Sequence, residues 1–120
     1  MYKLAMIDDE DTVLYNISQS FDWEAMGFSI VGMFNCAADF LEYKNSNPVD
    51  VVLTDINMPD MNGLDFVRSL DTAHYIVFTT AYPEFAIDGF KLNALDYLLK
   101  PFTFEEFMSS LASSIPSSWP

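Results

Sequence analysis

Residues 49–54 form a segment that is nearly all apolar and β-branched. Such a segment predicts a central strand of a parallel sheet, buried on both faces. Residues 2–7 form a second apolar segment that also reads as a buried strand. Parallel neighbours must be joined by crossover connections, which are usually helices. The chain is therefore constrained toward an α/β fold.

Predicted strands and helices alternate along the whole chain. Strands are predicted at residues 2–7, 29–34, 49–54, 75–79 and 96–99. Five helices are predicted between and after the strands. Four are indicated by apolar residues at helical spacing: Val13/Leu14/Ile17/Phe21, Ala37/Phe40/Leu41, Leu64/Val67/Leu70 and Phe104/Phe107/Met108/Leu111/Ile115. The fifth is predicted at residues 84–93. Five such units predict a doubly wound five-stranded parallel sheet with helices on both faces, because the crossovers are right-handed.

Acidic residues follow two of the predicted strands. Asp8, Asp9 and Glu10 come directly after the first strand, and Asp55 ends the third. If these strands are neighbours, their carboxylates meet at one sheet edge, where like charges oppose each other's ionisation. A hard divalent cation relieves this repulsion, and Mg²⁺ prefers oxygen ligands. The pattern predicts a magnesium site at Asp8, Asp9 and Asp55.

The triplet has a second interpretation as the start of a helix. Asp9, Glu10 and Asp11 also suit an N-cap with favourable dipole contacts. For the triplet taken alone, capping is favoured over metal binding, because short motifs are weak signals. Asp55 at the end of a second buried strand reverses that preference.

Composition limits the class of protein. The 120 residues are 51% hydrophobic, which suits one folded domain, and the single Cys36 cannot form an internal disulfide. No apolar run approaches the ~20 residues of a membrane span, so we expect a soluble, cytoplasmic protein. Eighteen acids and five bases give a net charge of −13, which disfavours direct nucleic-acid binding by this segment.

The carboxyl ends of the predicted strands carry the remaining candidate site residues. Ligands of doubly wound sheets bind beyond these ends. Besides the acids, the ends carry Thr79, Thr80 and Lys100. A metal pocket, a nucleophilic carboxylate, a hydroxyl and a cation are the groups needed to transfer and hold a phosphoryl group.

Four segments together resemble a known family. MIDDE, LTDINMPDMNG, FTTAY and DYLLKPF look like the signature segments of the receiver domain of bacterial two-component response regulators. They stand in the family's order and cover essentially the whole chain. The resemblance implies a flavodoxin-like sheet of order 2-1-3-4-5, the fold that chemotaxis receivers also have.

The resemblance also implies a role for each matching residue. Asp55 would be the phosphoacceptor, with a sensor histidine kinase as donor, Asp9 and Asp8 (Asp8 partly through water) as Mg²⁺ ligands and Lys100 pairing with the phosphoryl group. The roles implied for the remaining matches are the backbone carbonyl of Asn57 as a metal ligand, Thr80 and Tyr97 as switch residues, and Lys100-Pro101 as a cis peptide. Thr80 and Tyr97 also suit ordinary strand positions.

The expected activity is a phosphorylation switch that promotes its own phosphorylation and dephosphorylation without being a conventional turnover enzyme. Two alternatives stay open: an interaction module that is never phosphorylated, and a Mg²⁺-dependent phosphohydrolase. The second lacks the usual second acid, since Asn57 stands where that acid would be. An electron carrier of the same fold is disfavoured because Asp8, Asp9 and Glu10 replace a phosphate loop.

The output and the domain limits rest on weaker patterns. Residues 21–32 resemble receivers joined to AraC-type domains, and residues 80–102 resemble those joined to LytTR-type domains, so the output class is open. We expect a receiver domain at residues 1–115 and the start of a linker or tail at 116–120. The interval from residue 63 to residue 80 is shorter than usual in this family, which predicts a third helix of about two turns. We expect phosphorylation to promote homodimerisation through the face formed by residues 84–93, 96–99 and the last helix.

Overall fold

A computed structural model of the chain describes residues 1–56, 58, 60–61, 63–70, 75–80, 96–100, 102–103 and 105–109. Its sheet has five parallel strands in the order β2-β1-β3-β4-β5. The strands are β1 (Tyr2–Ile7), β2 (Phe28–Phe34), β3 (Val51–Asp55), β4 (Tyr75–Thr80) and β5 (Asp96–Leu99). The predicted fold class and strand order are both confirmed.

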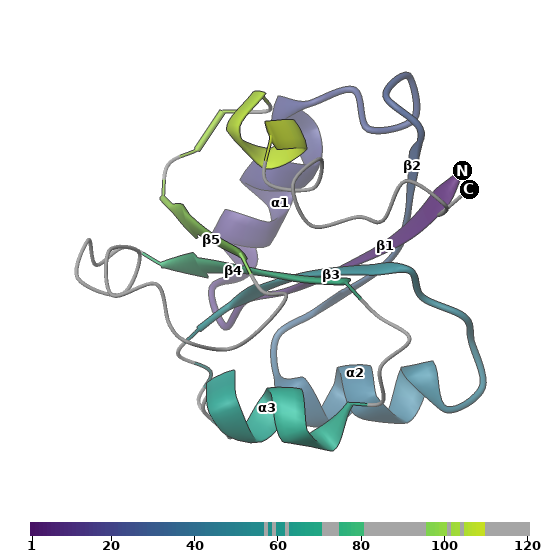
Figure 1. Cartoon of the computed structure of the whole chain (residues 1–120), viewed down its shortest axis with the longest axis vertical. Coiled ribbons are helices and arrows are strands. Elements are labelled where there is room, and N and C mark those ends of the chain that lie inside the picture. Colours follow the sequence, from purple (N-terminus) through teal and green to yellow (C-terminus); the bar gives the residue numbers. More distant parts are fainter. Residues whose placement is uncertain are drawn as a thin grey trace.

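Helices cover the two faces of the sheet (Figure 1). α1 (Asp11–Ser20) and the helical residues 105–109 lie on one face, whereas α2 (Ala37–Lys44) and α3 (Gly63–Ser69) lie on the other. The seven residues of α3 make about two turns, as predicted. The predicted helix at residues 84–93 lies outside the described residues.

The sheet divides the core into two layers, because side chains along each strand point alternately to its two faces. In β1, Leu4 and Met6 face the layer that contains Leu14 of α1 and Phe107. Their neighbours Ala5 and Ile7 face the other layer, with residues from α2 and α3: Ala37, Phe40 and Phe66. Successive side chains of a strand point to opposite faces, so a strand buried on both faces has to be apolar throughout.

Trp23 closes the layer beneath α1. It is 3% exposed, its indole N–H donates to the carbonyl oxygen of Ile17 at 3.2 Å, and its ring packs edge-on against Phe28 and Phe107. A buried indole needs such an acceptor for its N–H. This contact joins the second half of α1 to the segment that leads into β2.

Candidate phosphorylation and metal site

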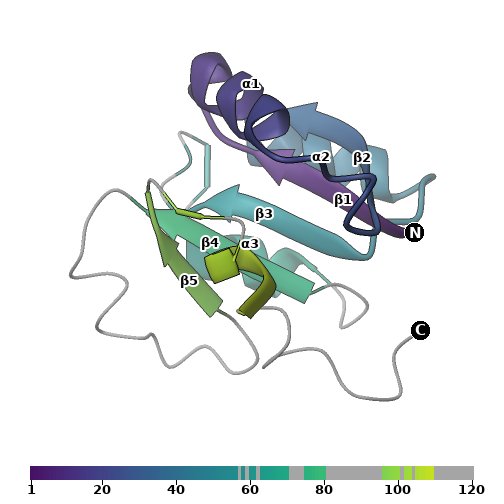
Figure 2. The same ribbon diagram turned by 90° about the horizontal axis from the view of Figure 1, so that it is seen from above.

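The predicted acids meet at the carboxyl end of the sheet. β1 and β3 are parallel neighbours with Ile7 paired to Thr54, so Asp8 and Asp55 come next on adjacent strands. One carboxylate oxygen from each of Asp8, Asp9 and Asp55 lies within 4.8 Å of the others. Figure 2 shows the strands side by side from above. The predicted juxtaposition of the three carboxylates is confirmed.

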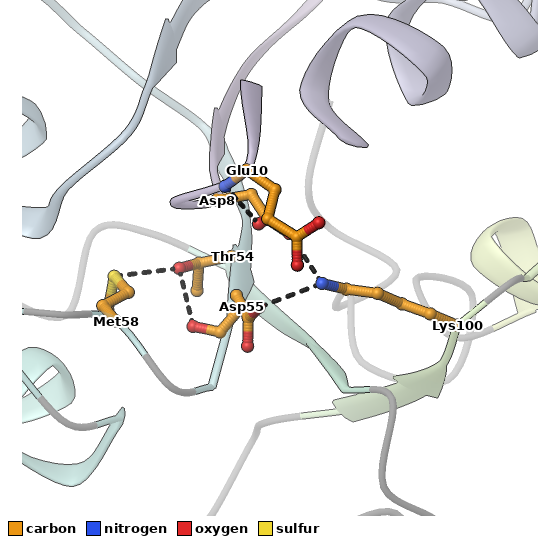
Figure 3. Close-up of polar contacts among 6 residues, drawn as sticks. All are labelled: Asp8, Glu10, Thr54, Asp55, Met58 and Lys100. Atoms are coloured by element: carbon orange, nitrogen blue, oxygen red, sulfur yellow. Dashed lines mark hydrogen bonds and ion pairs between the residues drawn. The ribbon is translucent and has the colours of Figure 1, made fainter. Parts of the chain in front are cut away.

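Lys100 enters this acidic cluster from the end of β5. Its Nζ donates to Asp8 Oδ2 at 2.6 Å and to Asp55 Oδ2 at 2.9 Å (Figure 3). Burial alone would lower the pKa of Lys100, but hydrogen bonds to Asp8 and Asp55 and the charges of both carboxylates outweigh burial and raise the pKa above its ordinary value. The ammonium is therefore charged at neutral pH and offsets part of the negative charge.

The three acids differ in how many of their oxygens are engaged. Asp8 is buried, and while Oδ2 accepts from Lys100, Oδ1 accepts from the backbone N–H of Glu10 at 3.0 Å. Asp9 is exposed, and within the described residues its side chain has no hydrogen bond or ion pair. Three carboxylates against one ammonium, with the Asp9 oxygens open, form a donor set that fits a hard divalent cation.

The helix-start interpretation of the triplet can be compared with the geometry. Glu10 is the N-cap residue of α1, but its side chain makes no capping hydrogen bond. The backbone carbonyl of Glu10 instead accepts from the N–H groups of Val13 and Leu14. Asp11 lies in the first turn of α1, as the dipole interpretation expects, but the N-cap side chain caps nothing. Asp8 lies before the helix, and its carboxylate accepts from Lys100 and from the N–H of Glu10.

The end of β4 lies beside the acids. Thr79 pairs in register with Asp55, and its carbonyl oxygen accepts from the N–H of Ile56 at 3.0 Å. Thr80 is 1% exposed, and its carbonyl oxygen accepts from the N–H of Lys100 at 2.7 Å. The end of β4 therefore connects backbone positions next to Asp55 with Lys100 itself.

Several predicted site residues lie partly or wholly outside the described residues. Asn57 and Pro101 are outside them, and so is the cis peptide expected at Lys100-Pro101. Tyr97 is described only as a backbone position of β5, where it pairs with Phe78. Their roles stay predictions.

One contact beside the site was missed by sequence reasoning. Asp60 accepts hydrogen bonds from the N–H groups of Ala37 and Ala38 at the start of α2. The residues are more than 20 positions apart, so no local capping pattern joins them. The one available signal was the lack of a capping side chain at Cys36, the residue before α2.

A groove lies beside Lys100 on the α1 side of the sheet. It has a volume of about 350 Å³, and apolar side chains of α1 and of the segment after β5 line much of it, among them Val13, Ile17, Phe21 and Phe102. Lys100 also lines it. The groove therefore adjoins the acidic cluster.

Comparisons with known proteins match this geometry. The family model of the response regulator receiver domain matches residues 4–112. The chain is 34% identical over 118 residues to the sensory transduction protein LytT of Bacillus anthracis, covering 92% of this chain and 46% of LytT. It is 40% identical over 103 residues to the transcriptional regulatory protein BtsR of Escherichia coli K12, covering 84% of this chain and 43% of BtsR.

A solved structure extends the comparison. The response regulatory domain of protein MrkE from Klebsiella pneumoniae superposes with a TM-score of 0.75 at 30% identity, covering 93% of each chain. The chain spans less than half the length of the curated relatives LytT and BtsR.

Among the described residues, no helix is both long and apolar enough to cross a membrane.

Proposed function

The chain belongs to the receiver-domain family of two-component response regulators, and we propose that it is a phosphorylation switch whose phosphoacceptor is Asp55. The observation that carries the proposal is the position of this carboxylate. Asp55 lies at the carboxyl edge of the sheet, within 4.8 Å of two further acids, and accepts a 2.9 Å hydrogen bond from Lys100. It is half-buried, so an incoming donor can reach it.

Magnesium is the metal that we assign to the acidic cluster. Asp9, Asp55 and the backbone carbonyl of Asn57 would hold it directly, and Asp8 would contribute partly through water. This assignment suits Asp8, because both of its oxygens already accept hydrogen bonds. When bound, Mg²⁺ would neutralise charge on the phosphoryl oxygens, which is its usual role in phosphoryl transfer.

In the proposed reaction, Asp55 is the nucleophile and Lys100 is the cation beside it. A carboxylate oxygen of Asp55 attacks the phosphorus of a phosphohistidine in line, the phosphorus–nitrogen bond breaks, and the imidazole leaves and takes up a proton. The ammonium of Lys100 stays beside Asp55 and stabilises the equatorial oxygens. Water later hydrolyses the acyl phosphate, which returns the Asp55 carboxylate and releases phosphate.

The phosphodonor is a sensor histidine kinase in this proposal. We assign its docking to the groove beside Lys100. Lys100 lines the groove and also donates a hydrogen bond to Asp55, so a partner bound in the groove would lie next to the phosphoacceptor. The apolar lining supplies contact area. The acids at the start of α1 would favour basic residues around the kinase's histidine.

Phosphorylation would act on an output through Thr80, Tyr97 and the face that the sequence predicts for residues 84–93, residues 96–99 and the last helix. Relatives named as transcriptional regulators support transcription control as the output of a longer protein. We assign residues 1–115 to the receiver domain and residues from 116 onward to a linker or tail. We propose that the protein acts in the cytoplasm. Direct nucleic-acid contact by this segment is disfavoured by its charge of −13.

The test is incubation with acetyl phosphate and Mg²⁺, followed by intact-mass measurement. We expect the mass of one phosphoryl group to appear on the wild-type protein, and not on Asp55→Asn. Asp39→Asn is the matched control, because Asp39 is an exposed acid of α2 outside the cluster. Absence of an adduct on the wild type would favour the phosphorylation-independent interaction module. An adduct on Asp55→Asn would refute the assignment of the phosphoacceptor.

A further inference from the structure

The first turn of α2 is capped by a residue from another part of the chain. Cys36, the residue before the helix, makes no capping hydrogen bond with its side chain. Asp60 supplies the acceptors instead: Oδ1 accepts from the N–H of Ala37 at 3.1 Å and Oδ2 from the N–H of Ala38 at 2.9 Å. Both oxygens of one carboxylate are therefore used at one helix end, where the dipole favours negative charge.

Asp60 lies on the segment that follows Asp55, and two other contacts hold the same segment. The N–H of Ile56 donates to the carbonyl oxygen of Thr79 at 3.0 Å. The buried Met58 accepts a hydrogen bond at Sδ from the Thr54 hydroxyl, over 3.4 Å (Figure 3). Ile56 and Met58 attach the segment to the sheet, whereas Asp60 attaches it to α2.

The start of α2 is also close in sequence to a contact with the other acidic loop. The N–H of Asp8 donates to the carbonyl oxygen of Phe34, the last residue of β2, at 3.0 Å. Only two residues separate Phe34 from Ala37, and Ala37 is fully buried. The turn between β2 and α2 is thus hydrogen-bonded to the loop of Asp8 on one side and to the segment after Asp55 on the other.

We propose that Asp60 is a positioning residue of the phosphorylation site, which fixes the spacing between Asp55 and the pair Asp8 and Asp9 by tying both loops to the turn before α2. This inference rests on the proposed function. Three sets of contacts are involved: Asp8 is hydrogen-bonded to Phe34, Ala37 to Asp60, and Lys100 to both Asp8 and Asp55. The chain itself joins Phe34 to Ala37 and Asp55 to Asp60, so contacts and chain together link the two acidic loops in a ring. The pairing of β1 with β3 brings the acids together, and the Asp60 contact would restrict the remaining movement of their loops. Its removal would therefore weaken a metal site that depends on the exact spacing of the acids.

The charge state of Asp60 suits this role. Burial is slight and would raise its pKa, but hydrogen bonds from the N–H groups of Ala38 and Ala37 outweigh it, and the pKa lies below its ordinary value. Asp60 is therefore an ionised acceptor at neutral pH. Charge-assisted hydrogen bonds are stronger than neutral ones.

The experiment compares Asp60→Ala, Asp60→Asn and the control Asp39→Ala in the 120-residue chain. Asp39 is in the first turn of the same helix, and within the described residues its side chain makes no hydrogen bond, so the control removes the same charge without breaking the tie. Magnesium affinity is measured by NMR titration of backbone amides, well below the unfolding temperature. Hydrogen exchange of the Ala37 and Ala38 amides reports the tie itself, with no metal present.

We expect Asp60→Ala to weaken magnesium binding by about tenfold, the low end of the ~10–100-fold effects of residues that support metal ligands. Exchange at Ala37 and Ala38 should accelerate in the same protein. Asp60→Asn should recover part of both, because its amide oxygen keeps one acceptor, and Asp39→Ala should bind magnesium like the wild type.

A purely structural cap predicts a different result. If Asp60→Ala loses thermal stability but binds magnesium as tightly as Asp39→Ala, the positioning role is wrong. If amide exchange at Ala37 and Ala38 is unchanged in Asp60→Ala, the hydrogen bonds from these amides to Asp60 do not form in solution, and the positioning role is wrong as well. If the wild-type protein itself binds no magnesium, the metal site of the proposed function is wrong and the positioning role falls with it. Normal wild-type binding with an unaffected Asp60→Ala overturns only the inference about Asp60.

Discussion

Lys100 donates a 2.6 Å hydrogen bond to Oδ2 of Asp8, a buried carboxylate 92 positions away in the sequence. The same ammonium reaches Asp55 at 2.9 Å. One lysine thus bridges the acids of two strands and supplies the positive charge that the described part of the cluster contains. Binding a divalent cation at these acids must therefore compete with, or rearrange around, this ammonium.

Replacing the lysine should destabilise the metal-free protein. We expect Lys100→Met to lower the free energy of unfolding by about 1.5–3 kcal/mol, the range for hydrogen bonds to charged groups, because Asp8 and Asp55 lose their shared donor. Urea denaturation at neutral pH measures the change. Lys3→Met is the control, since Lys3 is exposed at the opposite end of β1. Equal stability of Lys100→Met and the wild type would mean that the bridge contributes nothing.

The raised pKa of Lys100 predicts how this difference depends on pH. The folded pKa of Lys100 is raised. Such a lysine contributes its full stability below the unfolded pKa of about 10.4. The contribution is then lost as the pH rises through the higher folded pKa. The stability difference between wild type and Lys100→Met should stay constant from pH 7 to about pH 9 and shrink above ~10.4. A difference that grows in this alkaline range would contradict the assignment.

Asp9 should contribute more to magnesium binding than to folding. Its carboxylate is exposed and makes no hydrogen bond within the described residues, while its neighbour Asp8 is engaged twice. We expect Asp9→Ala to weaken magnesium binding by more than about tenfold, or ~1.4 kcal/mol, with an unchanged or slightly raised unfolding temperature because a like charge is removed. Calorimetric titration and thermal unfolding measure the two quantities. Unaltered magnesium affinity would exclude Asp9 as a ligand.

The core at β2 offers a test of packing. A Cβ at Gly32 would come within 2.6 Å of the ring of Phe34, which packs on Phe40 and Tyr43 at centroid distances of 5.7 and 5.3 Å. Gly32→Ala should therefore cost about 1–3 kcal/mol, as overpacking does, unless the ring can turn away. In a Phe34→Leu background the same change should cost much less. Chemical denaturation of the four proteins of this cycle measures the coupling, and equal costs in both backgrounds would show that the two positions do not interact.

Local sequence patterns predicted the strands well because most strands are buried on both faces. The limits of β1 and β5 were predicted correctly, whereas β3 was predicted to begin at residue 49 and begins at Val51. Asp50 explains the difference. Its carboxylate accepts from the N–H of Lys3 and its own N–H donates to the carbonyl oxygen of Lys3, so Asp50 fastens the entry of β3 to β1. Hydrophobicity alone does not reveal such a polar contact.

Part of the site was predictable from the strand order. Parallel neighbours bring their carboxyl ends together, so the convergence of Asp8, Asp9 and Asp55 follows once the strand order is known. The bond between Asp60 and the start of α2 follows from no local pattern, because it depends on how two loops pack. Contacts between loops require the three-dimensional structure, even when every strand and helix is placed correctly.

Phosphorylation at Asp55 should reach an output through Thr80 and β5. Buried Thr80 is joined through its carbonyl oxygen to the N–H of Lys100 and pairs in register with Leu99, which is 39% exposed on β5. A change at Thr80 is thus close to an exposed apolar position on an edge strand, the kind of surface that a partner can cover. A switch requires phosphorylation to favour one of two states through differential contacts.

We expect a beryllofluoride complex of the protein to form a homodimer through the face that contains β5, and Thr80→Ala to bind beryllofluoride but remain monomeric. The charge of −13 opposes association at low ionic strength, so sedimentation should be measured near physiological salt, where the Debye length is about 8 Å. Leu99→Ser is a second variant, since it changes the exposed side chain and leaves Thr80 and Lys100 intact. It should also weaken the dimer. A wild-type complex that stays monomeric, or a dimer whose contacts lie on α1, would refute this route from Asp55 to the output.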